Sequence, residues 1–262
     1  MLRYMKLYLC FLKNSVIREM AFRVGFFAQM LGSGIQFAVQ VLFFNLIYLH
    51  TKAIAGWTMP ETMFLLATNH LIGSLGAFLF GANLGTIPHH VRNGTLDMIL
   101  IKPVNAQFFV SIRNVGFSSL PNTLFSLPIF YYSIGHLDVS ITFIQMSFYL
   151  LLVICGVFIR YSLQMIAMTT SFWTTNVTAL YLILFDLFNL TGYPAEIFKG
   201  GARIIFSSIV PIIVIANFPT KVIIKAIKFW PILYVIIITL FFLLISRLFW
   251  NLSLRKYSSA SS

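Results

Sequence analysis

Charged side chains are scarce along this chain. Asp, Glu, Lys and Arg make up 9% of its 262 residues, and only six residues are acidic. Soluble domains carry about 25% charged residues. Because 59% of the residues are hydrophobic and the mean hydropathy is +0.91, the composition excludes an ordinary soluble domain. It predicts a protein that spans a membrane.

Residues that build enzyme sites are equally sparse. The two cysteines, Cys10 and Cys155, fall in a basic and an apolar segment, so we expect neither a disulfide nor a metal site. The acidic residues are spread singly, and no HExxH or GxSxG motif occurs. His89 and His90 are adjacent, and neighbours on a helix point about 100° apart. We therefore expect solvated loop histidines, no catalytic residue and no metal.

A nucleotide-binding motif is also missing. No GxxxxGK[ST] sequence occurs, so any ATP that drives this protein must be bound by another polypeptide. The net charge of +12 would suit nucleic acid in a soluble protein, but no aromatic and basic motif accompanies it. We attribute the basic residues to the flanks of membrane spans and to contacts with the lipid membrane, and expect no nucleic-acid partner.

What the chain does have is a series of long uncharged runs. A helix needs about 20 apolar residues to cross the hydrocarbon core. Six spans are predicted, at residues 22–49, 62–87, 112–133, 139–169, 174–194 and 231–250. Before them, residues 1–21 place basic and apolar side chains on different helical faces, which predicts an N-terminal interfacial helix; the alternative is the exposed start of the first span. We expect an all-α polytopic membrane protein, with residues 1–262 as a single domain.

One apolar run is too short to cross. Residues 204–216 are interrupted by Pro211, and Lys221, Lys225 and Lys228 follow at helical spacing. A short run with a basic face is typical of a re-entrant or interfacial segment, which we place at residues 204–229. With both termini cytoplasmic, eleven of the 18 Lys and Arg residues lie on the inner side and six on the outer, with Arg160 inside a span. This bias favours cytoplasmic termini.

Two helical stripes stand out within the predicted spans. In the first span a polar stripe recurs at spacings of three and four residues: Gln29, Ser33, Gln36 and Gln40. Such a stripe makes hydrogen bonds between helices or lines a wet substrate route. In the second span small residues recur every four positions: Gly73, Ala77, Gly81 and Gly85. This ridge lets another helix approach closely.

Two ionisable residues lie deep in the predicted spans. Arg160 is in the fourth span and Asp186 in the fifth. A short turn joins these spans, so they should be antiparallel neighbours, with the two residues offset by about 10 Å along the axis. We expect the two to pair, directly or through water, either to fix the register of the helices or to switch between transport states.

The most polar interruption is residues 92–103, RNGTLDMILIKP. It resembles the cytoplasmic loop of the small six-span type-2 ABC permeases, whose signature is R-x-G-T-L-D-x-x-L-x-K/R-P. The matching positions are Arg92, Gly94, Thr95, Leu96, Asp97, Leu100, Lys102 and Pro103. A second match, to a Y-P-x-x-I-F/Y motif followed by a short segment with an internal proline, covers residues 192–219. Its main positions are Tyr193, Pro194, Pro211 and Pro219.

The resemblance implies the membrane-spanning permease subunit of an ATP-driven exporter in a bacterial cell membrane. Residues 88–107 would form a cytoplasmic coupling loop that docks a separate ABC ATPase subunit, and that ATPase would bind ATP and Mg. Gly94 and Pro103 would bound a short helix, with Leu96, Ile99 and Leu100 as its apolar contact. A second permease, identical or related, would complete the dimer, and re-entrant helices would lie between spans five and six.

The main alternative is an ion-coupled secondary transporter. It would need inverted repeats and an ion site near the membrane midplane. The sequence shows no repeat, and Asp186 is the single midplane carboxylate. Peptide, lipid and hydrophobic drug all stay open as cargo, because aromatic residues are expected in any set of spans.

Overall fold

The computed structural model describes residues 2–21, 23–137, 139–174, 177–225 and 229–257. Helices account for 83% of the chain, and the described residues form no strand beyond an isolated antiparallel bridge between Ile54 and Trp57. The all-α prediction is therefore confirmed.

Thirteen α-helices follow one another in the described residues. They are α1 (Leu2–Ala21), α2 (Arg23–His50), α3 (Met59–Gly76), α4 (Ala82–Leu84), α5 (Ile87–Arg92), α6 (Asp97–Leu100), α7 (Ala106–Ile112), α8 (Leu120–His136), α9 (Phe143–Thr169), α10 (Thr178–Leu190), α11 (Gly200–Ile204), α12 (Ile212–Ile224) and α13 (Phe229–Lys256). Short π and 3₁₀ turns adjoin them: η1 (Ala77–Gly81), η2 (Phe117–Ser119), η3 (Thr170–Phe172), η4 (Ala195–Ile197) and η5 (Ile205–Ile209).

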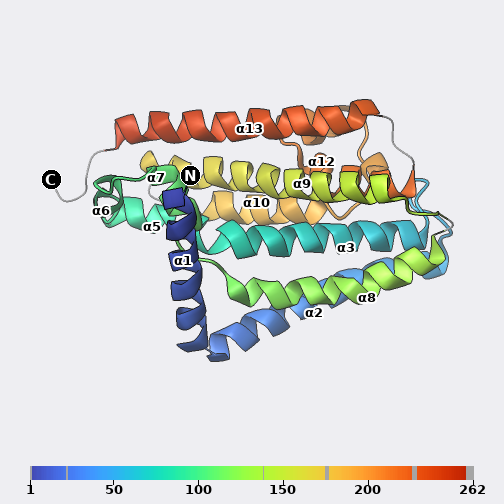
Figure 1. Cartoon of the computed structure of the whole chain (residues 1–262). Coiled ribbons are helices and arrows are strands. Elements are labelled where there is room, and N and C mark those ends of the chain that lie inside the picture. Colours follow the sequence, from blue (N-terminus) through green and yellow to red (C-terminus); the bar gives the residue numbers. More distant parts are fainter. Residues whose placement is uncertain (1, 22, 138, 175–176, 226–228, 258–262) are drawn as a thin grey trace.

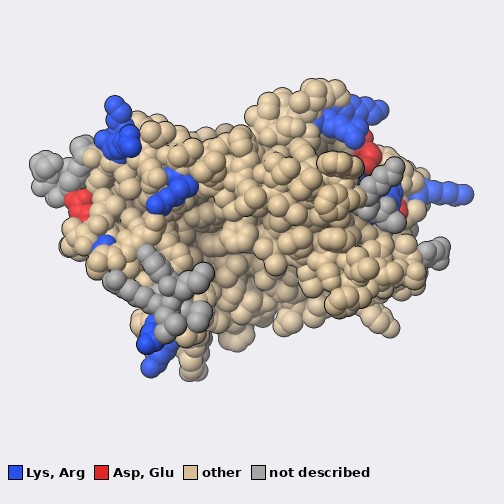
Figure 2. Space-filling model, turned by 45° about the horizontal axis from the view of Figure 1, so that its top comes forward, with Lys and Arg blue, Asp and Glu red and all other residues tan. Residues whose placement is uncertain are grey.

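The long helices run side by side as a bundle, and α1 lies across one end of it (Figure 1). The short helices α5, α6 and α7 gather at the same end, which we call the α6 end (Figure 1). Lys and Arg side chains lie toward the two ends, with a broad uncharged band between them (Figure 2). This distribution suits a bundle whose middle lies in lipid.

Four helices are long and apolar enough to cross a membrane. They are Val24–His50, Met59–Arg92, Phe143–Phe172 and Phe229–Lys256. A bent pair, Gly200–Ile209 with Ile212–Ile224, raises the number to five if it counts as one span. The six predicted spans are thus not all confirmed.

The two remaining predicted spans are shorter than expected. Helix α8 begins at Leu120 rather than near residue 112 and has 17 residues, because Pro121 is accommodated in a first helical turn. Helix α10 has 13 residues; residues 175 and 176 of that predicted span lie outside the described residues. At about 1.5 Å per residue these helices measure roughly 26 and 20 Å, against about 30 Å of hydrocarbon.

The core of the bundle lies around α3, α9 and α12. Helix α3 packs against α8, α9 and α12, while α9 also packs against α13. Half of the span window that contains α3 is buried, compared with 11% of that in α2. Helix α2 therefore lies at the edge, alongside α8 (Figure 1).

Local sequence explains where the central helices begin. At the start of α9, Thr142 Oγ1 accepts a bond from Gln145 N (3.3 Å), and Gln145 Oε1 accepts one from Thr142 N (2.9 Å). This reciprocal arrangement satisfies two backbone donors that the first helical turn leaves free. Thr58 and Glu61 repeat half of it at the start of α3, where Thr58 N donates to Glu61 Oε2 (2.7 Å).

Candidate functional site

The predicted coupling segment forms a compact turn at the α6 end. Helix α5 ends at Arg92, and Gly94 then adopts a φ of +67°, a conformation that glycine accepts without steric cost. The predicted short helix is α6, which lies between Gly94 and Pro103. His90 Nδ1 and Thr95 Oγ1, 2.8 Å apart, close the turn.

The prediction for the apolar face of α6 is wrong in part. Leu96 and Ile99 are 0% and 3% exposed, because they pack into an internal cluster with Trp250 and Met165. They stabilise the loop and are not available to a partner protein.

Three apolar residues are exposed here, two on α6 and one directly after it. Met98 is 69% exposed and Ile101 82%, while Leu100 is 36% exposed. Alternation of buried and exposed positions over so few residues gives no periodicity from which the outward face could have been read in the sequence.

Polar contacts tie α7 to the long helices. Arg247 on α13 donates from Nη1 to Asn105 Oδ1 (3.0 Å) and to Gln107 Oε1 (2.9 Å). Ser111 Oγ lies 2.9 Å from the hydroxyl of Tyr161 on α9. These hydrogen bonds join the loop to α9 and α13. Sequence analysis missed Arg247 and Tyr161, because nothing in the sequence links positions so far apart.

Helix α1 is attached to the segment after α7. Arg18 Nη1 donates to Asn114 Oδ1 (2.7 Å), and Ser15 Oγ, on a buried side chain, accepts from Val115 N (2.9 Å). Between α1 and the loop lies a groove of about 530 Å³, whose walls include Lys102 and Pro103. Lys102 Nζ also lies 4.6 Å from the centre of the Phe109 ring.

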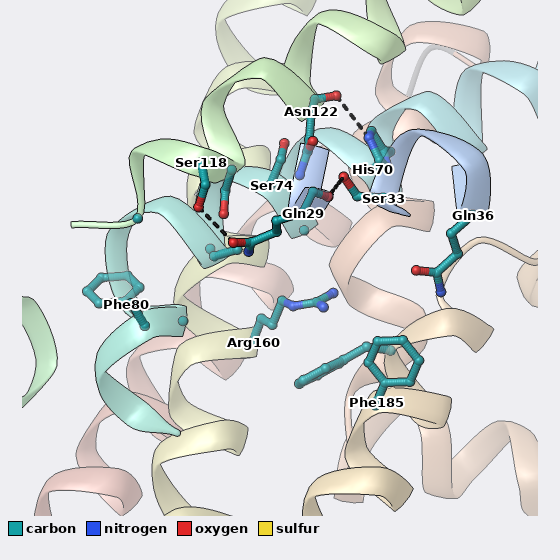
Figure 3. A pocket seen from close by; sticks show the side chains of 18 of the residues that line it. Gln29, Ser33, Gln36, His70, Ser74, Phe80, Ser118, Asn122, Arg160 and Phe185 are labelled. Carbon is teal, nitrogen blue, oxygen red and sulfur yellow. Dashed lines mark hydrogen bonds between the residues drawn. The ribbon is translucent and has the colours of Figure 1, made fainter. Parts of the chain in front are cut away.

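A second feature is a polar cavity of about 560 Å³ between α2, α3, α9 and α10. Its walls include the predicted polar residues of the first span and Arg160, as Figure 3 shows. They also include several amides, hydroxyls and aromatic rings: Asn69, His70, Ser74, Phe80, Ser118, Asn122, Gln164, Tyr181, Phe185, Phe188 and Asn189.

The polar stripe of the first span lines this cavity. Gln29, Gln36 and Gln40 all contribute to its walls. Gln29 also makes a hydrogen bond between helices, since its Oε1 accepts from Ser118 Oγ (2.9 Å; Figure 3). Ser33 Oγ instead donates to the carbonyl of Gln29 in its own helix (2.9 Å).

Arg160 reaches from α9 into the middle of the cavity (Figure 3). Its guanidinium carbon lies 4.1 Å from the centre of the Phe188 ring on α10. Within the described residues this guanidinium makes no ion pair and no hydrogen bond.

The expected pair between Arg160 and Asp186 is not formed. The described residues contain one ion pair, Lys221 with Glu196. Asp186 is exposed and lies outside the cavity wall. The reason is the rotation of α10: Phe188 follows Asp186 by two residues, which places the two side chains about 200° apart around the helix.

The small-residue ridge accommodates Arg160 in its first half. A Cβ atom built on Gly73 would lie 3.7 Å from Arg160 Nη1. Ala77 and Gly81 also line the cavity, whereas Gly85 is exposed and has only the carbonyl of Gly81 near its Cβ position. The close approach expected of the ridge occurs at Ala77, where a Cβ on Gly116 would meet the Ala77 carbonyl oxygen at 3.1 Å.

The second matched segment is brought together by Asn217. This residue of α12 is fully buried, donates to the carbonyl of Tyr193 (3.1 Å) and accepts from Ala195 N (2.7 Å). Pro194 precedes η4 between these two bonds. Asn217 therefore fixes the turn after α10.

The segment predicted to be re-entrant or interfacial contains a sharp bend. The two halves of the bent pair meet at 86°, and Pro211 is the residue at the start of α12. Pro219 is buried inside α12.

Helix α12 does not lie in an interface as a basic amphipathic helix. Nearly all its residues are buried, and Lys221 Nζ is 2.8 Å from Glu196 Oε1. Lys225 Nζ lies 5.5 Å from the centre of the Trp57 ring; Lys228 lies outside the described residues. The expectation failed because α12 packs against α3 and α9, which leaves no apolar face for lipid.

Glu196 joins three segments at the end opposite α6. Its Oε2 accepts a bond from Trp57 Nε1 (2.6 Å), and its Oε1 binds Lys221. Burial alone would raise the pKa of this carboxyl, but the Lys221 and Trp57 contacts outweigh it and hold the pKa below its usual range. No spacing in the sequence indicated this cluster.

A family model described as ABC-2 family transporter protein matches residues 35–261. The chain belongs to this family. It is the permease subunit of an ABC transporter and a multi-pass membrane protein. No curated protein and no solved structure matches the chain. The match covers the loop with α6, the cavity residues from Gln36 onward and the bent segment.

Proposed function

We propose that this permease subunit forms the path of an ATP-driven exporter and is driven by a separate ATPase subunit, which binds ATP and Mg. The observation that carries the proposal is the exposed apolar surface formed by α6 and the residue after it, on a loop bonded to the long helices. Met98 and Ile101 are 69% and 82% exposed. A single exposed apolar residue is ordinary, but adjacent ones rimmed by polar groups mark a protein interface.

The fastening of the loop explains how docking would move the spans. An ATPase bound to α6 pushes on α7, and α7 is bonded to α13 through Arg247 and to α9 through Tyr161. Helix α9 carries Arg160 into the cavity. The loop and the cavity are thus joined by one helix, so ATP-driven movement at one changes the other.

The cavity is the part of the chain suited to be the path. Gln36 on α2 is exposed and lines it, which indicates that the cavity opens along α2. A second permease, a copy of this chain or a related one, would close that side. Alternating access then requires the cargo to bind the two states with different affinity.

The same proposal sets the orientation. The α6 end lies in the cytoplasm with both termini, in a bacterial cell membrane, and α1 lies in the inner interface. Helices α8 and α10 serve as the two shorter spans. The bent pair of α11 and α12 is re-entrant from the outer side. The basic side chains at both ends (Figure 2) would contact lipid headgroups.

The test measures docking of the ATPase. The tagged full chain is purified from its native host, and co-purified vanadate-sensitive ATP hydrolysis is measured for wild type, Met98→Glu and Ile101→Glu. Each variant should lose about tenfold or more of the activity, because a buried charge at an interface costs several kcal/mol. Phe143→Glu is the control, since Phe143 is 87% exposed and is the first residue of α9, which begins at the end opposite α6 (Figure 1). Full activity in both loop variants would contradict the proposal.

A further inference from the structure

We propose that the cavity binds an amphipathic organic anion, with Arg160 as the residue that binds its carboxylate or phosphate group. This inference rests on the proposed function and names the class of its cargo. It follows from the charge, the geometry and the walls of the cavity.

The charge of Arg160 needs a partner. The residue lies within the 30-residue span Phe143–Phe172, where a cation is costly unless an anion or polar groups meet it. Its guanidinium makes neither an ion pair nor a hydrogen bond in the part of the chain that the structure describes. The Phe188 ring centre lies 4.1 Å from the guanidinium carbon, and the N–H edge of the guanidinium carries no hydrogen bond to the described residues.

The free edge has the right geometry for an anion. All five N–H donors of a guanidinium lie in its plane, where they form a fork that matches carboxylate and phosphate oxygens. Gly73 and Gly76 leave room for the side chain against α3, with Cβ positions 3.7 and 3.5 Å from Arg160 atoms. The charge is therefore placed in the open part of the cavity (Figure 3).

The other walls carry little charge and favour an apolar body. The one carboxylate that lines the cavity in the described residues is Glu19 on α1, which forms no ion pair with Arg160. The remaining polar groups are the imidazole of His70 and neutral amides and hydroxyls, while Phe37, Phe80 and Phe185 supply apolar surface. A volume of about 560 Å³ falls within the roughly 300–1,000 Å³ of small-molecule sites.

The test uses three probes with one body and different charge. Pyrenebutyrate, pyrenebutanol and pyrenebutylamine are titrated into the full chain in phosphatidylcholine nanodiscs, and binding to empty nanodiscs is subtracted. Wild type should bind pyrenebutyrate about tenfold or more tightly than pyrenebutanol, as expected for a hydrogen bond to a charged group. Pyrenebutylamine should bind most weakly.

Variants assign the preference to Arg160. Arg160→Gln should bind pyrenebutyrate and pyrenebutanol equally, while Arg160→Lys should keep part of the preference, because it retains the charge without the fork. Arg255→Gln, a matched change at an exposed arginine, should leave all three affinities unchanged.

Equal binding of the three probes by wild type would overturn the inference. That result is also the one expected if a carboxylate of a second subunit neutralised Arg160. The wild-type comparison decides the matter even if Arg160→Gln does not fold. The measurement needs neither ATPase nor nucleotide, so a failure of ATP-driven transport would leave a charge preference standing, and the two proposals fail separately.

Discussion

The two sides of α9 differ in how closely the neighbouring helix packs and in whether the charged side chains are paired. Toward α12 the helices touch, since a Cβ on Gly156 would lie 2.7 Å from the Ile215 carbonyl oxygen. Helix α12 also carries Lys221, whose charge is neutralised by Glu196 at 2.8 Å. Toward α10 the same helix carries Arg160 into a cavity, where it forms no ion pair with the described residues.

The difference separates stability from function within one bundle. Tight packing and a paired charge lower the free energy of the folded state. An open cavity and an unpaired cation raise it, and a protein retains such features where a ligand needs them. Substitutions on the two sides of α9 test this contrast.

Adding a side chain at Gly156, where α9 and α12 touch, should have the largest effect. Gly156→Ala should lower the free energy of unfolding by about 2 to 3 kcal/mol, because the added Cβ collides with the backbone of α12. Gly73→Ala is the control: its Cβ meets Arg160 in ordinary contact at 3.7 Å, and alanine favours helix by about 1 kcal/mol. It should be neutral or stabilising. Denaturant unfolding of both variants in one detergent measures the difference, and equal losses would remove the contrast.

Breaking the paired charge should have the next largest effect. Glu196→Gln should lower the free energy of unfolding by about 1 to 2 kcal/mol, between the values for surface and buried pairs. The side chains of Lys221 and Glu196 are 19% and 32% exposed. Asp186→Asn, at an exposed carboxylate, should change it by less than about 0.5 kcal/mol. Similar losses in the two variants would show that the pair is not what stabilises this end.

Sequence reasoning found the polar residues of the cavity but not their partners. Composition predicted the helical membrane class, and Gly94 and Pro103 correctly bounded α6. The three glutamines and Arg160 were identified as polar residues inside spans, and the cavity contains all of them. These predictions needed only local spacing.

The failures all needed the relative rotation of helices. Whether Arg160 meets Asp186 or Phe188 depends on how α10 is rotated, which its largely apolar sequence does not indicate. Trp57 and Glu196 are 139 residues apart. The outward face of α6 depends on packing against α13. Such contacts are set by tertiary structure and leave no periodic signal in the sequence.

Low pH should remove the stability that the ion pair of Glu196 and Lys221 contributes. The folded-state pKa of Glu196 is below the ordinary value of 4.5, so its contribution to stability is complete above that value. It is lost as the pH falls through the lower folded-state pKa. Between pH 6 and strongly acidic pH, wild type should therefore lose more thermal stability than Glu196→Gln. Parallel pH profiles of the two proteins would contradict this.

Removing the unpaired charge should have the smallest effect, with the opposite sign. Arg160→Met removes a cation that forms no ion pair with the described residues. The apolar methionine side chain can still pack against Phe188, which Arg160 contacts. We expect the free energy of unfolding to stay equal or to rise by up to about 1 kcal/mol. Lys221→Met, a matched change at the paired charge, leaves Glu196 without its cation and should lower the free energy of unfolding. Thermal unfolding of the two variants in one detergent gives the two signs. Equal destabilisation of both variants would show that Arg160 stabilises the fold. It would contradict the view that its charge is retained for a ligand.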